Sequence, residues 1–412
     1  MNILYIAPYL PDDPAGTPNI GGSLAAQSKI ALVCSALGRL GHQVTLLSSA
    51  VTSDARKGWQ QGRIEDVVFD GFRCTVVSPG ILHLRPLGGL LNLARAGVMG
   101  RRVALEHNPD LVLCYNSYCF EYLAAAAIHK AIGSPVILEV EDLPLARRRG
   151  VLNIKPRLDQ FAWPRMLRMA AASTAVSGEI YDILPADRPR MLFPGVISKH
   201  LLAASQGRTS AFRRNDPQTR VGYFGSISTS KGCDRLLDVI RDSPSGFRYV
   251  VSGSGPLAEK FAQYARAYPN RLSYLGVVPR VRLYQEMCKC DICVVPPERV
   301  STAGAVFPFK VCEYLVSGSH VIASGLDPVS IARLDLACIQ RWDGSSADFF
   351  HQLRVASEHF HRAETRRKQA VERIKREYSL DGVSSALQRL LEGVIRSALS
   401  RHGSELPAHS CV

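Results

Sequence analysis

The stretch Phe307-Pro-Phe-Lys-Val-Cys-Glu-Tyr-Leu-Val-Ser-Gly-Ser-His-Val-Ile-Ala-Ser324 predicts a loop, a short helix and a buried strand in succession. Pro308 suits a helix start, where its missing N–H is not needed, and Gly318 suits the left-handed position that follows a helix. The apolar run after Gly318 is typical of a buried strand. A helix followed by a buried strand is the repeating unit of a parallel α/β sheet.

Glu313 lies in the first turns of this predicted helix. A helix start gathers unpaired N–H groups and partial positive charge, which favour phosphate, and a carboxylate can accept two hydrogen bonds from a ribose diol. The stretch alone therefore fits a nucleotide site, and it fits equally well a buried helix with a solvated glutamate. The rest of the chain must decide between these two interpretations.

The same rhythm of buried strands and helices runs through both halves of the chain. In the second half, buried strands are predicted at 221–224, 249–251, 272–275 and 292–295. In the first half they are predicted at 3–7, 44–47, 74–77, 111–114, 136–138 and 174–176, with helices at 23–40 and 118–132. Strands buried on both faces and separated by helices predict an α/β protein with doubly wound parallel sheets, in two facing Rossmann-like domains.

The chain of 412 residues exceeds what one hydrophobic core usually supports, so two domains are expected. The pattern lapses into small and polar residues between about Pro194 and Arg220. We therefore predict domains at 1–197 and 198–380, a helix at 381–400 that packs back toward the first domain, and a flexible tail at 401–412. Ligands of open α/β sheets bind beyond the carboxyl ends of the strands, so the cleft between the domains is the expected active site.

Composition narrows the class of protein. The content of 46% hydrophobic and 21% charged residues is that of a globular chain, and the net charge of +14 favours an anionic partner such as a nucleotide or an acidic membrane. Nucleic acid is disfavoured because no nucleic-acid-binding signature is present. The run 81–99 is interrupted by Arg85, Pro86 and Arg95, well short of the ~20 apolar residues that a membrane span needs.

The 11 cysteines are mostly scattered singly, in a chain without a recognisable secretory signal. This usage predicts reduced thiols and a cytoplasmic location. Cys288, Cys290 and Cys293 are close in sequence, but they should diverge between a helix end and a strand, and no fourth ligand follows at zinc spacing. We expect buried thiols there and no metal site.

Three loops after strands of the second domain carry residues that suit phosphate: Gly225–Gly232, Ser252–Pro256 and the loop that ends in Phe309 and Lys310. Glycine lets backbone N–H groups approach an anion closely, and Lys231 would add a positive charge for a diphosphate. None of these loops is specific alone. The run from Gly253 to Gly255, for example, also fits a tight turn between a strand and a helix.

The segments together resemble the GT-B glycosyltransferases that use nucleotide sugars, in particular the retaining family 4 type. The resemblance rests on the order and spacing of Gly21-Gly22, Tyr223–Gly232, Val251–Pro256, Tyr274–Val278, Asp291–Pro296 and Phe307–Ser324. It implies that Glu313 binds the ribose hydroxyls, that Lys231 binds the diphosphate, and that Val277 and Val278 line the base. It also assigns donor contacts to Gly21, Gly22, Gly253, Phe309 and Lys310.

The chain departs from the family pattern at three places. Ser226 stands where the family often has an arginine, and Ala305 stands where many members have a carboxylate, which Glu298 could replace from the same loop. Where many members have a histidine after a first-domain strand, this chain has Glu141 followed by Asp142.

Glu141 and Asp142 are the predicted catalytic residues. A carboxylate there could hold sugar hydroxyls, orient the acceptor or stabilise positive charge at the anomeric carbon, whereas the alternative is a pair of exposed acids capping a turn. The resemblance implies retention of configuration, with the leaving phosphate oxygen helping to deprotonate the acceptor. No cofactor and no metal are expected, because Lys231 and helix-end N–H groups would offset the charge of the departing diphosphate.

A basic run lies in the domain that receives the acceptor in this family. It comprises Arg147–Arg149, Lys155, Arg157, Arg165 and Arg168, interleaved with Leu152, Phe161, Trp163 and Leu167. It could rest on an anionic membrane surface to reach a lipid-linked glycan, or it could be an ordinary solvated face.

These features together predict a cytoplasmic glycosyltransferase that can associate with the inner face of the membrane. It would move a sugar from a nucleotide-diphosphate sugar to a glycan or lipid-linked acceptor, in cell-surface polysaccharide or glycolipid synthesis. Two alternatives stay open. One is a nucleotide-sugar epimerase of the same fold, and the other is a catalytically silent GT-B subunit, suggested by Ser226 and Ala305.

Overall fold

The computed structural model describes residues 1–11, 24–49, 58–83, 87–144, 154–206, 218–297, 308–326, 328–333, 338–358 and 364–403. The chain divides into two compact units, which are described separately. Unit 1 comprises 1–176, 180–196 and 383–412, and unit 2 comprises 177–179 and 197–382. The short segment Ser177–Glu179 groups with unit 2, although the sequence analysis assigns it to the first domain.

Unit 1 is built on a sheet whose eight strands among the described residues follow the order β10-β9-β8-β7-β1-β2-β5-β4. Neighbouring strands are parallel except β4 and β5, which form an antiparallel hairpin at one edge. The strands are β1 (Asn2–Ala7), β2 (Gln43–Ser48), β4 (Arg63–Phe69), β5 (Phe72–Ser78), β7 (Leu111–Tyr115), β8 (Val136–Val140), β9 (Ala172–Ala175) and β10 (Arg190–Leu192). A separate antiparallel pair joins β3 (Gly58–Gln60) to β6 (Ile81–His83).

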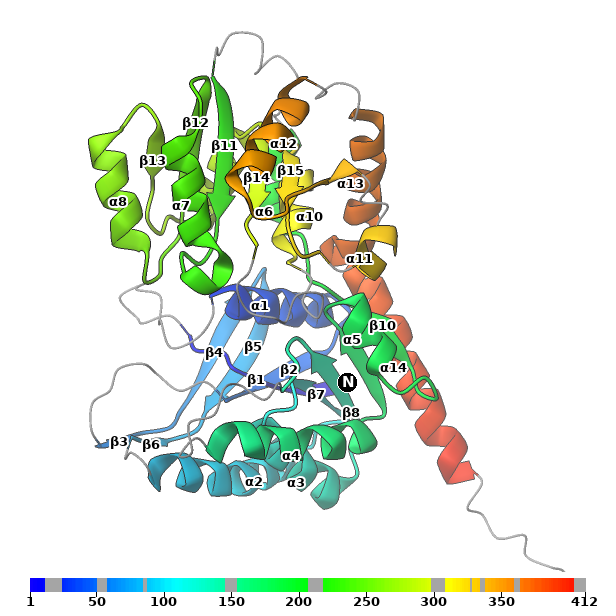
Figure 1. Ribbon diagram of the computed structural model, residues 1–412. Coiled ribbons are helices and arrows are strands. Elements are labelled where there is room, and N and C mark those ends of the chain that lie inside the picture. The colour runs from blue at the N-terminus through cyan, green and yellow to red at the C-terminus, as the bar shows by residue number, and fades with distance from the viewer. Residues whose placement is uncertain are drawn as a thin grey trace, which may run out of the picture. The chain divides into compact units, whose positions relative to one another are not determined.

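Helices cover both faces of the unit 1 sheet. Figure 1 shows α2, α3 and α4 together on one face and α1 on the other. The helices of this part of the chain are α1 (Leu24–Arg39), α2 (Leu87–His107), α3 (Cys119–Ile132), α4 (Ile154–Met169), α5 (Gly178–Ile183) and the last helix, α14 (Leu380–Gly403). The central strands β7 and β8 are buried at every residue, as expected for parallel strands covered on both faces.

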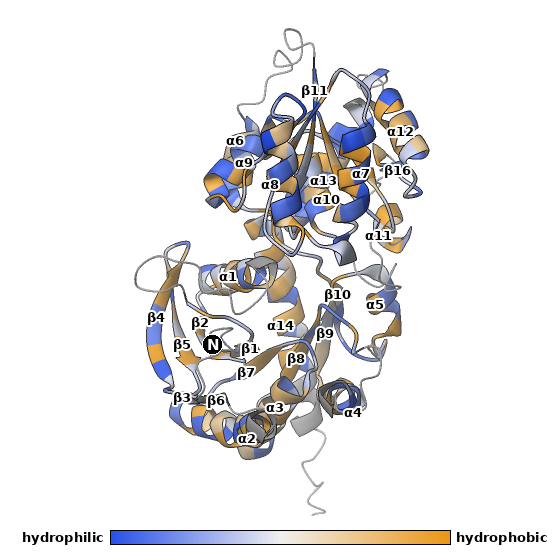
Figure 2. Ribbon diagram, turned by 60° about the vertical axis from the view of Figure 1, so that its left-hand side comes forward, coloured by the Kyte–Doolittle hydropathy of each residue, from blue (hydrophilic) through white to orange (hydrophobic). Residues whose placement is uncertain are grey.

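The edge strand β4 differs from the central strands because it faces solvent. Its residues Ile64 and Val68 are 63% and 64% exposed, and Figure 2 shows polar and apolar residues mixed along it. The sequence analysis did not predict β4, because its mixed composition lacks the apolar run of a buried strand.

Unit 2 is built on a parallel sheet whose six strands among the described residues follow the order β13-β12-β11-β14-β15-β16. The strands are β11 (Thr219–Phe224), β12 (Phe247–Ser252), β13 (Leu272–Tyr274), β14 (Ile292–Val295), β15 (His320–Ala323) and β16 (Gln340–Arg341). The helices are α6 (Lys199–Gln206), α7 (Cys233–Asp242), α8 (Ala258–Ala267), α9 (Arg280–Cys288), α10 (Lys310–Val316), α11 (Pro328–Arg333), α12 (Ser346–Glu358) and α13 (Glu364–Tyr378), with a 3₁₀ turn, η2 (Thr229–Lys231).

The two faces of this sheet bury two separate hydrophobic cores. Successive residues of a strand point to opposite faces, so Tyr249 and Val251 pack with α7, α8 and α12, whereas Val250 packs with α6, α9, α10 and α13. The predicted α/β fold with two doubly wound, Rossmann-like domains is confirmed.

Two details of the prediction need correction. In the opening stretch, α10 begins at Lys310, two residues after Pro308, although Gly318 does adopt a left-handed φ of 84° before β15. The last helix, α14, continues to Gly403, so the predicted tail at 401–412 begins too early. Within the described ranges, no helix is both long enough and apolar enough to cross a membrane.

Candidate active site

Three glycine-containing loops meet at the carboxyl edge of the unit 2 sheet. They follow the neighbouring strands β11, β12 and β13, and backbone hydrogen bonds join them. The N–H of Gly225 donates to the Ser252 carbonyl at 2.9 Å, and the N–H of Gly253 donates to the Gly276 carbonyl at 2.9 Å. The Ile227 N–H donates to the Ser254 carbonyl at 2.8 Å. These bonds fix the loops at the edge where open α/β sheets bind ligands.

The close approach of two of these loops requires glycine. A Cβ atom added to Gly253 would lie 1.8 Å from the Gly225 carbonyl oxygen, and one added to Gly255 would lie 2.3 Å from that of Ile227. Both glycines also have φ near +150°, which other residues rarely adopt. Gly253 therefore lies in a tight turn between a strand and a helix, as one of the two interpretations predicted. A contact between Gly253 and a ligand stays a prediction.

Lys310 brings a positive charge to the same loops. An ideal Cβ built on Gly225 would lie 2.8 Å from Lys310 Nζ, and the ammonium lies 4.9 Å from the ring centroid of Tyr223. Ser226, which the sequence analysis places where the resembled family often has an arginine, is exposed beside it. Lys310 thus supplies a cation in the immediate surroundings of the position where the arginine is missing.

Glu313 lies one turn after Lys310 on α10 and is half-buried. Its Oε1 accepts a hydrogen bond from the Tyr284 hydroxyl of α9 at 3.4 Å. Burial raises the pKa of Glu313, while Lys310, the Tyr284 hydrogen bond and Arg280 act in the opposite direction. The carboxylate is therefore held by an oriented hydroxyl and by nearby positive charge.

The remaining predicted donor residues of unit 2 lie on the same edge or next to it. Lys231 ends the 3₁₀ turn after β11 and is half-buried. Val277 and Val278 follow Gly276 in the loop after β13, and Val277 is 57% exposed. Phe309 precedes α10, and its ring packs edge-on against Tyr378 with centroids 5.9 Å apart.

In unit 1, Glu141 directly follows β8 and forms an ion pair with Lys29 of α1. Lys29 Nζ also lies 3.1 Å from Glu139 Oε1, donates to the Phe193 carbonyl at 3.0 Å, and lies 4.2 Å from the Phe193 ring centroid. Glu139 lies within β8, and its Oε2 accepts a hydrogen bond of 2.5 Å from the Tyr5 hydroxyl of β1. Glu141 is thus part of a buried ionic cluster.

The surroundings of Glu141 place its pKa near neutrality. Burial has the largest effect and raises the pKa, Lys29 lowers it, and Glu139 raises it again, to about 7. The pKa of Lys29 is lowered by burial, but the carboxylates Glu141 and Glu139 outweigh this and raise it. A carboxyl group that titrates near pH 7 is suited to roles in acid–base or charge-stabilising chemistry.

Asn116 holds the backbone that carries both predicted catalytic acids. It follows β7 with a left-handed φ of 64°, and its Oδ1 accepts the backbone N–H groups of Glu141 at 2.7 Å and of Asp142 at 3.0 Å. Asp142 itself is exposed, and its Oδ2 accepts a hydrogen bond from the Tyr118 hydroxyl at 3.4 Å. The two acids therefore differ, because only Glu141 is built into the unit 1 interior.

Several predicted residues lie outside the described ranges, namely Gly21, Gly22, Arg147–Arg149, Leu152, Glu298, Ala305 and Phe307. Of the predicted basic run, Arg157, Phe161 and Arg168 are exposed on α4. The Arg165 guanidinium stacks 3.3 Å from the centroid of the Phe161 ring.

The cysteines predicted to diverge make separate contacts. Cys290 Sγ donates to the Glu286 carbonyl and Cys293 Sγ donates to Ser319 Oγ, and both thiols are buried. In the part of the chain that the structure describes, no three His, Cys, Asp or Glu side chains are grouped as a metal site would require.

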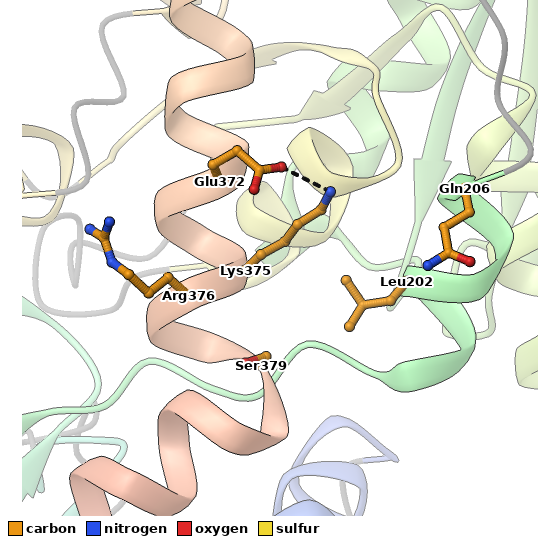
Figure 3. A pocket seen from close by; sticks show the side chains of 6 residues that line it. All are labelled: Leu202, Gln206, Glu372, Lys375, Arg376 and Ser379. Carbon is orange, nitrogen blue, oxygen red and sulfur yellow. Dashed lines mark hydrogen bonds and ion pairs between the residues drawn. The ribbon is translucent and has the colours of Figure 1, made fainter.

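A cavity of about 400 Å³ lies elsewhere in unit 2, between α6 and α13. Figure 3 shows Leu202 and Gln206 on one side and Glu372 and Lys375 on the other, with the Lys375 ammonium 3.2 Å from the Glu372 carboxylate. None of the predicted donor or catalytic residues lines this cavity.

The sequence analysis missed Lys29, Glu139, Asn116 and Tyr284. A signal existed for the first two. Glu139 interrupts an otherwise apolar strand, and Lys29 lies at helical spacing from the buried Val33, so each charge occupies a core position.

Comparison with known proteins matches both halves of the chain to family models. Residues 26–191 match the glycosyl transferase 4-like domain, and residues 218–334 match the glycosyl transferases group 1 domain. A search of curated proteins by sequence finds no significant match.

Solved structures of similar fold cover almost the whole chain. Sucrose-phosphate synthase from Thermosynechococcus elongatus is 12% identical, with a TM-score of 0.70, over 96% of this chain and 99% of that one. The trehalose 6-phosphate synthase from Burkholderia multivorans is 12% identical, with a TM-score of 0.66, over 96% and 99%. HepE from Anabaena, solved with UDP and glucose, is 16% identical, with a TM-score of 0.64, over 95% and 99%.

At these identities the solved structures establish the fold alone, and the family models carry the assignment. Both models describe glycosyltransferase domains, and they match the two halves in the order expected of a GT-B enzyme. The chain therefore belongs to the family 4-like GT-B glycosyltransferases.

Proposed function

We propose that this glycosyltransferase moves a sugar from a nucleotide-diphosphate sugar to a glycan or lipid-linked acceptor, with retention of configuration, in cell-surface polysaccharide or glycolipid synthesis. One observation carries the donor part of the proposal. Glu313, held by Tyr284, lies one helical turn from Lys310, whose ammonium reaches the glycine loop after β11.

This arrangement suits a nucleoside diphosphate. The Glu313 carboxylate can accept hydrogen bonds from both ribose hydroxyls, and the Lys310 ammonium beside the Gly225 loop can contact a phosphate oxygen. Lys310 and Lys231 would offset the charge that grows on the diphosphate as it leaves. We expect the reaction to need no metal ion, because these lysines supply the positive charge.

In the proposed reaction, the bond between the anomeric carbon and the diphosphate oxygen breaks, and a bond to the acceptor oxygen forms on the same face of the sugar. The acceptor proton passes to the leaving phosphate oxygen. Glu141, when ionised, would stabilise positive charge on the sugar or orient the acceptor. Its pKa of about 7 leaves a substantial ionised fraction at physiological pH.

Structures of similar fold suggest which donor to try first. HepE was solved with UDP-glucose, and a trehalose-6-phosphate enzyme from E. coli was solved with UDP-2-fluoro glucose. Those ligands belong to those proteins. They make UDP-sugars the first candidates here, with GDP- and ADP-sugars as the alternatives.

A thermal-shift screen of UDP-, GDP- and ADP-sugars tests the proposed donor class, because a ligand that binds only the folded state raises the melting temperature. We expect one base class to raise it, and the same nucleoside without its diphosphate to raise it less. The hit is then incubated without acceptor. Formation of an epimer would favour the epimerase alternative, and the absence of a shift with every nucleotide sugar would contradict the proposal.

We propose that the acceptor side includes an anionic membrane surface, bound through the exposed Arg157, Phe161 and Arg168 of α4. An exposed aromatic ring beside basic side chains suits the interface of acidic lipids. Flotation with anionic vesicles should recover the wild type better than a variant with all three residues changed to serine. Changing the exposed Arg101 and Arg102 of α2 to serine is the matched control. Equal recovery of the α4 variant and the wild type would refute this proposal.

A further inference from the structure

Lys29 lies between two carboxylates of unit 1, the buried Glu139 and the largely buried Glu141, and the sequence analysis gave it no role. It comes from α1, whereas Glu139 lies within β8 and Glu141 directly follows it. The exposed fractions of the three side chains are 9%, 2% and 13%. Charged groups are seldom buried to this extent unless they are paired, so the contacts among these three residues, called the Lys29 cluster below, fix their ionisation.

The charges of the Lys29 cluster do not balance. When all three groups are ionised, the two carboxylates and one ammonium have a net charge of −1, largely shielded from solvent. Glu139 has compensation from elsewhere, because the Tyr5 hydroxyl donates to its Oε2 at 2.5 Å. Glu141 has only the Lys29 ammonium among the side-chain hydrogen-bond donors described for it.

Lys29 is itself held from two places, the end of β8 and the residue that follows β10. Its ammonium contacts Glu141 and Glu139 at the end of β8 and donates to the carbonyl of Phe193, which follows β10, at 3.0 Å. The Phe193 ring lies on another side, with its centroid 4.2 Å from Nζ. Because these contacts surround the Lys29 ammonium, its positive charge is fixed in position. A fixed positive charge can hold a carboxylate in one place.

We propose that Lys29 is a positioning residue for Glu141, holding its carboxylate at the carboxyl end of β8 and keeping it ionised beside Glu139. This inference rests on the proposed function, in which the ionised Glu141 acts on the sugar or the acceptor. Lys29 would therefore affect the reaction only through Glu141.

Each neighbour of Glu141 shifts its pKa in a definite direction. Burial, Glu139 and the nearby Asp142 raise it, and Lys29 lowers it. Tyr115 of β7 faces the same carboxylates. Burial and these carboxylates raise the pKa of Tyr115, so the Tyr115 hydroxyl stays neutral. Without Lys29 every remaining effect favours the protonated acid. Without the Glu139 charge the pKa of Glu141 should fall toward its ordinary value.

The pH dependence of kcat for donor turnover tests the inference in three variants: Lys29→Met, Lys29→Arg and Glu139→Gln. We expect wild-type kcat to rise with pH through about 7. Lys29→Met should move this midpoint to higher pH and lower kcat at pH 7 by about tenfold or more, with the donor KM changed less than about threefold. Lys29→Arg keeps the positive charge and should restore most of kcat, and Glu139→Gln should move the midpoint to lower pH.

A second readout does not depend on activity. The pKa of Glu141 is raised on folding, so the folded chain holds this proton more tightly than the unfolded chain. Its stabilising contribution is complete below the unfolded pKa, and it is lost as pH rises toward about 7. Urea unfolding should therefore give a lower free energy of unfolding at pH 8 than at pH 5 in the wild type. This difference between the two pH values should be smaller in Glu141→Gln and larger in Lys29→Met.

The two readouts separate the two claims. If Glu141→Gln leaves kcat unchanged but the pH-dependent stability differs as expected, the proposed catalytic role of Glu141 fails and the coupling to Lys29 stands. If the kcat profile and the pH-dependent stability of Lys29→Met both match the wild type, the inference is overturned. Should Lys29→Met not fold, an unmoved kcat midpoint in Glu139→Gln overturns it equally.

Discussion

At the residue scale, Glu313 and Glu141 are two carboxylates with different surroundings and different proposed duties. Glu313 is half-buried and oriented by the Tyr284 hydroxyl at the edge of the unit 2 sheet. Glu141 is paired with Lys29 inside unit 1. Local sequence was enough to single out Glu313, since its helix, loop and strand are contiguous. It could not reveal Lys29, because Lys29 and Glu141 are 112 positions apart.

Lys310 illustrates the same limit. The family resemblance implied that Ser226 stands where many members have an arginine, and only the fold shows that the Lys310 ammonium approaches Gly225. Changing Lys310 to Met should weaken binding of the nucleotide sugar by about 10- to 100-fold, because a hydrogen bond to a charged group contributes about 1.5–3 kcal/mol. Titration calorimetry with the donor identified by thermal shift measures this.

The matched control for Lys310 is Lys260→Met, which removes an exposed charge from α8. We expect that variant to bind the donor like the wild type. Equal weakening in both variants would mean that net charge alone matters, and it would remove Lys310 from the donor site.

At the scale of elements, continuous apolar runs predicted the central strands well, because strands buried on both faces have no need of polar alternation. The edge strands β4, β10 and β16 and the short strands β3 and β6 were missed. Val67 and Val68 of β4 stand beside Glu65 and Asp66, so their sequence indicates no single period. The Asp70-Gly71 turn that joins β4 to β5, in which both residues have positive φ, is a local hairpin signal that the sequence analysis did not use.

The loop after β12 gives a prediction about stability at this scale. Gly253→Ala should lower the free energy of unfolding by on the order of 3 kcal/mol, because the new Cβ would lie 1.8 Å from the Gly225 carbonyl oxygen and the loops would have to part. Gly246→Ala is the control. It also has a positive φ, 95°, but no atom lies within 4 Å of its added Cβ, so the cost should be about 1 kcal/mol. Urea unfolding that gives equal losses for both would show that the loop contact is unimportant.

At the scale of the whole molecule, the chain builds unit 1, then unit 2, and then returns to unit 1 with α14. The Ser384 hydroxyl of α14 donates to the Ala36 carbonyl of α1 at 3.3 Å, which joins positions 348 apart. The size of the chain and the repeated strand–helix rhythm predicted two domains. The cleft expected between them stays a prediction.

The central claim is the proposed division of labour between the units, in which unit 2 would bind the nucleotide sugar through Glu313 and Glu141 of unit 1 would act in the reaction. Calorimetric titration of the donor into the wild type, Glu313→Ala and Glu141→Gln tests it most directly. We expect Kd to rise about 10- to 100-fold in Glu313→Ala and to change less than about threefold in Glu141→Gln, because only the first removes charged hydrogen bonds to the ribose. An equal Kd in the wild type and Glu313→Ala would contradict the claim.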